Sequence, residues 1–174
     1  MLSPELVSYP GFIAYGISAR TAMEAEVDSG RARGPAVWTR FYDEALPARL
    51  SANAANGRVV GVYSSYENGA RGKFTITAGV QMLRNQPRPA GLDAVTVSPG
   101  EYLRFTGYGM GPQSVAQVWS GVHDFFALLE HPLSGSFERA FTADFERYGE
   151  PDAVHVFVAV KRKLGVHSSG TRLT

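Results

Sequence analysis

The sequence predicts an α+β fold in which two pseudosymmetric β-α-β-β modules share an antiparallel sheet and leave a central cleft. An amphipathic stretch that carries a tryptophan occurs twice, at Trp38 and at Trp119, and an aromatic-rich segment ending at Tyr66 or Tyr148 follows each at nearly the same distance. The segments that flank both stretches alternate apolar and polar side chains, as strands do. Such a repeat indicates two copies of one supersecondary unit, whose seam is a natural place for a pocket.

The first half of the chain predicts a strand, a helix and two further strands. β-Branched and aromatic residues before Ala19 are typical of a strand, which Pro10-Gly11 interrupts, and Pro35 stands where a helix start tolerates proline. Asn68-Gly69 indicates the turn between the last two strands. The expected elements are a strand over 6–19, a loop or helical turn over 21–34, a helix from 35 to about 50, a break over 53–57, and strands over 59–66 and 73–83.

The second half repeats this order after a joint over 85–91, where Pro87 and Pro89 interrupt regular structure. Pro112 stands near the start of a helix with the clearest apolar stripe of the chain, and His131-Pro132 ends it. The expected elements are strands over 94–97 and 102–108, a helix from 112 to about 129, and strands over 139–148 and 154–161.

Length and composition fit one globular domain with its own core. The chain has 174 residues, of which 44% are hydrophobic and 19% charged. We expect one domain over 1–163, with half-modules over about 6–84 and 92–163, and a tail over 164–174. The net charge is +1 and the only basic run is 161–163, so we expect no direct binding of nucleic acid.

The absence of cysteine excludes disulfides, thiolate zinc sites and cysteine nucleophiles. The four histidines do not stand at the spacing of metal ligands, so we expect neither a metal nor a cofactor. The N-terminus lacks the pattern of a signal peptide, and no apolar stretch is long enough to span a membrane. The expected location is therefore the cytoplasm.

The strand expected over 139–148 carries the best candidates for a binding or catalytic role. Alternation places Glu146 and Tyr148 on one face and Phe145 on the other, and we expect the Phe145 face to pack under the Trp119 helix. In the neighbouring strand, Phe157 faces away from the valines, so we expect Glu146 among aromatic side chains that include Phe157. A carboxylate desolvated by such walls is costly unless it is paired, and a bound organic cation would relieve that cost.

Several other interpretations of these residues remain open. Glu146 is also compatible with a surface strand, where it would pair with Arg147 or a lysine. The helical spacing of Trp38 is typical of a core residue, whereas Trp119 is equally compatible with the core and with a cleft. Asp144 and Glu146 would lie about 7 Å apart on one strand face, a separation compatible with a hydrolase that uses two carboxylates.

The segments 59–67, 74–80, 97–102, 118–119, 144–148 and 154–161 together resemble the GyrI-like small-molecule-binding family. This family also occurs as the effector-binding domain of AraC-type and MerR-type multidrug-responsive regulators. The resemblance extends from about Leu6 to Lys163 and implies a ligand cleft between the two modules. The pocket glutamate of the family falls on Glu146 and its helix tryptophan on Trp119. Tyr148, Tyr66 and Tyr108 are further candidates for the cleft walls.

The resemblance implies a protein that binds lipophilic, cationic aromatic compounds, in the sensing or sequestration of drugs or toxins. The two predicted helices both belong to the core, so we expect no helix-turn-helix, and action on DNA would need a separate DNA-binding protein or another protein partner. One alternative is a hydrolase of strained cyclopropane-containing natural products, with Glu146 as general base or water-positioning group. The other is a protein-interaction module such as a gyrase inhibitor.

Overall fold

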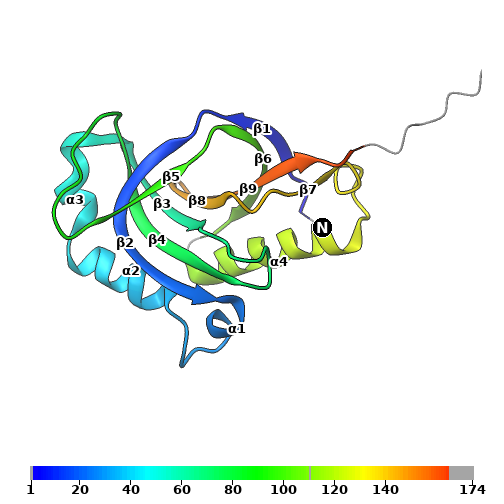
Figure 1. The fold of residues 1–174 in the computed structure, drawn as a ribbon, viewed down its shortest axis with the longest axis horizontal. Helices are drawn as coiled ribbons and strands as arrows, with labels where there is room; N and C mark the ends of the chain where they lie inside the picture. Colours follow the sequence, from blue (N-terminus) through cyan, green and yellow to red (C-terminus); the bar gives the residue numbers. More distant parts are fainter. Residues whose placement is uncertain (1, 110, 165–174) are drawn as a thin grey trace, which may run out of the picture.

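One strongly curved antiparallel sheet carries helices on one of its faces (Figure 1). The computed structural model describes residues 2–109 and 111–164. The strands are β1 (Glu5–Tyr9), β2 (Phe12–Ala22), β3 (Ala54–Ser64), β4 (Lys73–Met82), β5 (Asp93–Val97), β6 (Gly100–Tyr108), β7 (Phe137–Arg139), β8 (Ala143–Glu150) and β9 (Ala153–Arg162). The helices are α1 (Met23–Glu26), α2 (Gly34–Asp43), α3 (Leu46–Leu50), the 3₁₀ turn η1 (Ser51–Asn53) and α4 (Pro112–Leu128).

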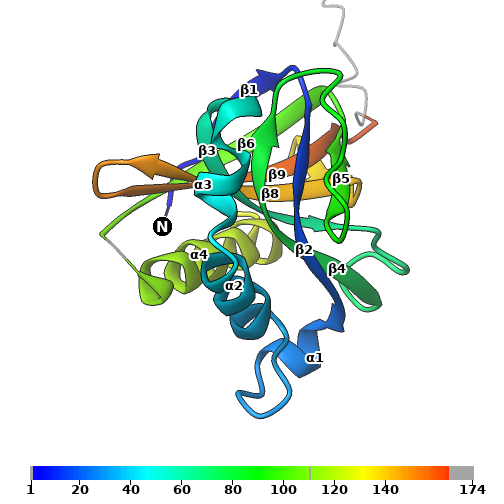
Figure 2. The same ribbon diagram turned by 90° about the vertical axis from the view of Figure 1, so that its left-hand side faces the viewer.

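The strand order is symmetric about the pair β3 and β8. The order is β1-β6-β9-β8-β3-β4-β2-β5, and β7 adds to β9. Outward from the seam between β3 and β8, the order β3-β4-β2-β5 on one side corresponds to β8-β9-β6-β1 on the other. Each half of the chain also carries one long helix, α2 or α4, on the same side of the sheet (Figure 2). The predicted α+β class with an antiparallel sheet is confirmed.

The two halves exchange their first strands. Residues 5–9 pair with 100–104, and residues 12–16 pair with 93–97 in the same register. β1 therefore extends the strands of the second half, while β5 extends those of the first. The crossing occurs at Pro10-Gly11 opposite Ser98-Pro99, where Gly11 has φ +75° and a β-carbon on it would lie 2.6 Å from the Val97 carbonyl oxygen. A residue with a side chain would be strained at this position.

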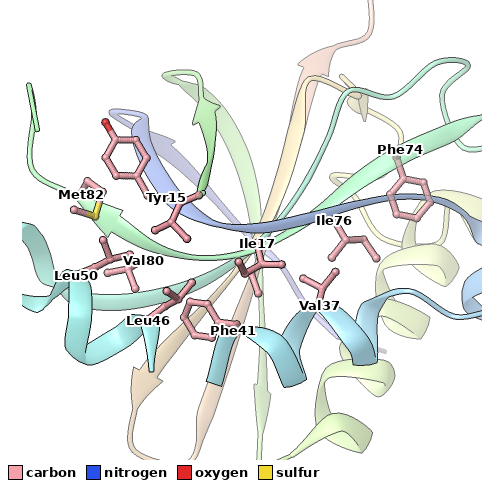
Figure 3. Packing of buried hydrophobic residues seen from close by; sticks show 12 residues of the cluster. Tyr15, Ile17, Val37, Phe41, Leu46, Leu50, Phe74, Ile76, Val80 and Met82 are labelled. Atoms are coloured by element: carbon pink, nitrogen blue, oxygen red, sulfur yellow. The ribbon is translucent and has the colours of Figure 1, made fainter. Parts of the chain in front are cut away.

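Three apolar clusters hold the sheet and helices together. The first lies between α2 and the first half of the sheet and includes Phe41, Leu46 and Ile76 (Figure 3). The second fills the inner side of the curved sheet, where the rings of Phe145 and Phe157 stack with their centroids 4.5 Å apart. The third lies under α4 and contains the valines of β9. The helices thus cover one sheet face, while the sheet curls around aromatic side chains on the other.

The face of β8 that meets α4 differs from the prediction. Phe145 pairs with Phe157 across β8 and β9, and both side chains lie in the inner cluster. Glu146 pairs with Val156, whose side chain packs in the cluster under α4. The expectation that the Phe145 face packs under the Trp119 helix is therefore wrong. The curvature of the sheet creates an inner core that takes the large rings, and this leaves the Glu146 face toward the helices.

Several element boundaries also differ from the predicted ones. The helix expected to about residue 50 is divided into α2 and α3 at Ala45, which has φ 52°. The strand expected over 139–148 is divided into β7 and β8 around Phe141, which also has φ 52°. Of the predicted tail, residues 165–174 lie outside the described residues. Among the helices that are described, none is long and apolar enough to cross a membrane.

Candidate functional site

A cavity of about 1350 Å³ lies where α2 and α4 approach the seam between β3 and β8. Its walls are mainly apolar, and residues from both halves of the chain contribute to them. The hairpin between β8 and β9 contributes a continuous run from 148 to 154. The aromatic residues of the lining are Trp38, Tyr42, Tyr63, Tyr66, Phe74, Trp119 and Tyr148.

Glu146 lies at the seam and is 1% exposed. Its Oε1 accepts hydrogen bonds of 2.6 Å from the Tyr63 hydroxyl and of 2.6 Å from the Trp119 indole N–H. Its Oε2 accepts a hydrogen bond from the Tyr148 hydroxyl. All three donors are neutral, and no lysine, arginine or histidine of the described residues forms an ion pair with this carboxylate. The side chain is thus solvated by hydrogen bonds without a counter-charge.

Burial sets the proton affinity of this cluster. Burial raises the pKa of Glu146 above its ordinary value, and the hydrogen bonds from Tyr148, Tyr63 and Trp119 oppose that shift. Burial also raises the pKa of Tyr63 and of Tyr148, and the nearby Glu146 carboxylate raises both further. Both phenols therefore remain protonated donors, and Glu146 is the group of this cluster whose charge can change.

Gly61 makes room for the carboxylate. It lies opposite Glu146 in the pairing of β3 with β8. A β-carbon on Gly61 would lie 2.7 Å from Glu146 Oε2 and 3.0 Å from Trp38 Cζ2. A larger residue would therefore displace either the carboxylate or the tryptophan ring.

The two tryptophans approach the seam from the two long helices. Val118 and Val122 anchor α4 on the sheet, and Trp119 lies beside them with its ring against Tyr63, at a centroid distance of 5.0 Å. Trp38 of α2 meets the Tyr148 ring edge to face at 5.4 Å. Trp38 packs against the first apolar cluster, as its helical spacing predicts, and it also lines the cavity. The helices therefore hold the two indoles around Glu146.

The sequence matches the Cass2 family, described as integron-associated effector binding protein, over residues 5–161. The chain belongs to the Cass2 family. The predicted resemblance to GyrI-like small-molecule-binding proteins is confirmed.

Individual relatives of this Cass2-family chain match most of its length. YobU of Bacillus subtilis (strain 168), which carries the name of a transcriptional regulator protein, is 26% identical over 155 residues that cover 84% of this chain and 91% of YobU. An integron cassette protein from the mobile metagenome of Vibrio cholerae is 29% identical, with a TM-score of 0.72 over 91% of this chain and 95% of that one. A protein solved with bound tetraphenylphosphonium is 18% identical, with a TM-score of 0.71 over 92% and 94% of the two chains.

A second carboxylate, Asp144, lies behind the cavity wall of this Cass2-family protein. It is fully buried and forms an ion pair with Arg139, which is 12% exposed. The Tyr66 hydroxyl donates to Asp144 Oδ2 at 2.8 Å, and the Ala159 amide donates to Oδ1 at 2.8 Å. Asp144 is not among the residues that line the cavity. Because its oxygens are already bonded, the geometry gives no support to a hydrolase that uses Asp144 and Glu146 together.

The ionisable lining of the cavity is predominantly acidic. The acidic lining residues are Glu26, Glu146, Glu150 and Asp152. Among the described lining residues, the basic groups are Arg139, which Asp144 neutralises, and His123. Burial lowers the pKa of His123, and the charge of Arg139 lowers it further, so the imidazole is neutral at pH 7.

Glu26 and Glu150 are held in place by other groups. Glu26 Oε1 accepts from the Arg33 amide at 2.8 Å, and its Oε2 accepts from the Gly34 amide at 3.1 Å, which caps the start of α2. Glu150 forms an ion pair with Arg147 and a hydrogen bond with His155. Glu146 differs from both because its partners are the side chains of the cavity wall.

The structure brings together most of the predicted site residues but not all. Glu146, Trp119, Tyr148 and Tyr66 line the cavity. Tyr108 does not: it is 80% exposed at the end of β6. Phe157 is 2% exposed in the inner cluster, so the prediction that it forms a cavity wall is wrong, because its side chain lies on the other face of the sheet.

The sequence-based reasoning did not identify several residues of the lining, among them Tyr63, Trp38 and Arg139. Tyr63 shares a strand face with Gly61, and the contact with Glu146 follows only from the pairing of β3 with β8. The internal repeat related Trp38 to Trp119, and this signal could have identified Trp38. The sequence gives no comparable signal for Arg139.

Proposed function

We propose that this protein binds lipophilic organic cations in its cavity and acts in sensing or sequestering them, with Glu146 as the counter-charge. One observation carries the proposal: a buried carboxylate at the cavity seam has three neutral hydrogen-bond donors and no cationic partner among the described residues. A buried charge without a partner is unfavourable. A cation bound in the cavity would supply the missing partner.

The composition of the walls supports the same ligand class. Aromatic faces attract cations by roughly 0.5–2 kcal/mol each, and they also bury apolar ligand surface. The cavity volume of about 1350 Å³ exceeds the range of roughly 300–1,000 Å³ that is common for small-ligand pockets. Trp38 and Trp119 approach the carboxylate from opposite halves of the chain, so a flat or multi-ring cation would contact several rings at once.

The comparisons give independent support for this class. The family description names effector binding, and the relative solved with tetraphenylphosphonium holds a lipophilic cation. Tetraphenylphosphonium combines a positive charge with four phenyl rings, and this chemistry fits a carboxylate inside aromatic walls.

A pair of ions with nearly the same shape provides a direct test. Tetraphenylphosphonium and tetraphenylborate differ chiefly in the sign of their charge. We expect the cation to bind with a Kd on the order of micromolar and to quench tryptophan fluorescence, whereas the anion binds at least tenfold more weakly. Isothermal titration calorimetry would measure both affinities at pH 8.

Two matched variants test whether the preference for cations originates at Glu146. Glu146→Gln keeps the shape of the side chain, and its amide can still bond with Tyr63, Trp119 and Tyr148. We expect this variant to lose about tenfold or more in affinity for the cation. Glu138→Gln makes the same chemical change at an exposed residue that pairs with Lys161, and it serves as the control. Equal binding of the two ions, or unchanged cation affinity in Glu146→Gln, would refute the proposal.

A further inference from the structure

A second polar group faces the cavity at Arg139, at the end of β7. Arg139 lines the cavity with Tyr66 and His123. Its guanidinium carbon lies 4.4 Å from the centre of the Phe141 ring, so this ring supports one side of the group. Nη2 donates to Asp144, while the buried Nε has no hydrogen-bond partner among the described residues. Because Nε is buried away from the cavity, the donors that remain for a ligand are the N–H groups of Nη1 and Nη2.

The partner of Arg139 is already saturated. Asp144 accepts from Arg139, Tyr66 and the Ala159 amide, and it is 0% exposed. The charges of Arg139 and Asp144 cancel, so this end of the cavity does not require a further anion. A guanidinium has five N–H donors, and a single bond to Asp144 leaves donors for another acceptor. A neutral acceptor such as a carbonyl oxygen therefore fits better than a carboxylate.

The ligand acceptor that would bond with Arg139 lies close to Glu146 along the seam between β3 and β8. Asp144 and Glu146 are alternate residues on one face of β8, which separates them by about 7 Å. Tyr63 pairs with Asp144 across the seam and donates its hydroxyl to Glu146. One ligand of ordinary size can therefore reach both groups, with its cationic part at Glu146 and another part at Arg139.

We propose that Arg139 forms an acceptor subsite, and that the preferred ligands are lipophilic cations that carry a neutral hydrogen-bond acceptor roughly 7–10 Å from the group that meets Glu146. This inference rests on the proposed function, because the cationic part is placed by Glu146. It adds a requirement that a simple cation such as tetraphenylphosphonium does not meet. The subsite would thus select among the many cations that aromatic walls can accommodate.

Two phosphonium ions that differ in one carbonyl group test the subsite. The probes are (4-benzoylbutyl)triphenylphosphonium and (5-phenylpentyl)triphenylphosphonium, in which a methylene replaces the ketone. A hydrogen bond to a charged group predicts that the ketone binds the wild-type protein roughly tenfold more tightly. Calorimetry at pH 8 would measure the ratio of the two affinities. Equal affinities in the wild-type protein would overturn the subsite without any variant being made.

Variants of Arg139 then test whether this residue causes the preference for the ketone. In the double variant Arg139→Met with Asp144→Asn, both charges are removed together, so that no unpaired charge remains buried. The affinity ratio should fall close to one. The control removes a matched but exposed pair, with Arg104→Met and Glu5→Gln, and should keep the ratio. Arg139→Lys provides a second variant that keeps the charge pair but removes the planar set of donors, and it should reduce the ratio.

The outcomes separate the subsite from the proposed function. If both phosphonium ions bind with equal affinity, the cation site exists and the acceptor subsite does not. If the ketone preference persists in the double variant, the acceptor bonds elsewhere and the assignment to Arg139 is wrong. If neither ion binds the wild-type protein, the proposed function fails and the subsite fails with it. A ketone preference that Glu146→Gln keeps and the Arg139 variants lose would support the subsite.

Discussion

Gly61 and Glu146 face each other across the seam between the two halves of the chain, and the carboxylate occupies the space that a side chain at position 61 would need. A β-carbon on Gly61 would approach Oε2 to 2.7 Å. Gly61 belongs to β3 and Glu146 to β8, so each half of the chain contributes one side of this arrangement. The binding site and the association of the two halves therefore depend on the same residues.

Gly61→Ala should weaken cation binding and lower the stability. The added methyl group would displace the carboxylate or the Trp38 ring, at a cost of about 1–3 kcal/mol in the free energy of unfolding. Urea denaturation and titration with tetraphenylphosphonium would measure both effects. Gly100→Ala is the matched control, because a β-carbon there meets no atom within 4 Å. Unchanged affinity in Gly61→Ala would show that the carboxylate position is not critical.

The stability of the ligand-free protein should depend on the protonation of Glu146. Its pKa is raised in the folded state, so the folded state binds the proton more tightly than the unfolded state does. Stability is therefore lost as the pH rises from the ordinary value of 4.5 through the raised folded value. Each pH unit of that interval corresponds to about 1.4 kcal/mol.

Glu146→Gln has no such proton to lose. Relative to the wild-type protein, this variant should gain stability as the pH rises from 4.5 through the raised folded-state pKa of Glu146, and the relative gain should be absent in Glu138→Gln. Free energies of unfolding from urea titrations at several pH values would measure the difference. A constant difference between Glu146→Gln and wild type across this range would contradict the prediction.

Binding of a cation should release protons. The cation stabilises the carboxylate form, so it lowers the pKa of Glu146 toward its ordinary range. Near the raised pKa, up to about one proton per bound cation should leave, and the affinity should fall as the pH is lowered through it. Calorimetry in two buffers with different ionisation enthalpies counts the protons. Glu146→Gln should release none, and equal release by both proteins would assign the protons to another group.

Trp119→Phe should change the pH dependence of binding as well as the affinity. The substitution keeps an aromatic ring but removes the N–H that donates to Glu146 Oε1. Loss of a hydrogen bond to the charged form should raise the pKa of Glu146 further. The pH midpoint of cation binding should rise accordingly. Trp38→Phe is the control, because the Trp38 indole is not among the hydrogen-bond donors to the carboxylate, and a similar rise there would contradict the assignment.

Arg139→Met should destabilise the protein, because it leaves Asp144 buried and unpaired. Loss of one partner of a buried ion pair costs about 3–5 kcal/mol. The added change Asp144→Asn should restore most of this loss, and a double-mutant cycle in urea would measure the coupling. Additive effects of the two substitutions would show that the pair is not coupled in the folded protein.

The sequence was sufficient to predict much of the fold. The internal repeat predicted two similar halves, and the helical stripe after Pro112 predicted α4 with nearly correct ends. Local signals of this kind depend on neighbours in sequence, and for that reason they can be read from the chain. The division of the predicted strand at Phe141 was missed, since a positive φ at a residue other than glycine has no local signature.

The candidate site was predicted less completely, for a physical reason. Glu146, Trp119 and Tyr148 were identified from the sequence, but the face of the sheet to which Glu146 belongs was not. Strand alternation says which residues share a face and not which face meets a helix. Phe157 was therefore assigned to the cavity, although the curved sheet takes its ring into the inner core.

The sequence by itself determined the elements, the two-fold repeat and the presence of one acidic side chain among aromatic residues. The tertiary structure decided what that side chain meets. Pairing of β3 with β8 places the Tyr63 hydroxyl beside Glu146 and leaves room for the carboxylate at Gly61, which has no side chain. Helix α4 adds the indole N–H of Trp119. These residues lie far apart in the chain, and their contacts depend on strand register and sheet curvature, which no local pattern of residues specifies.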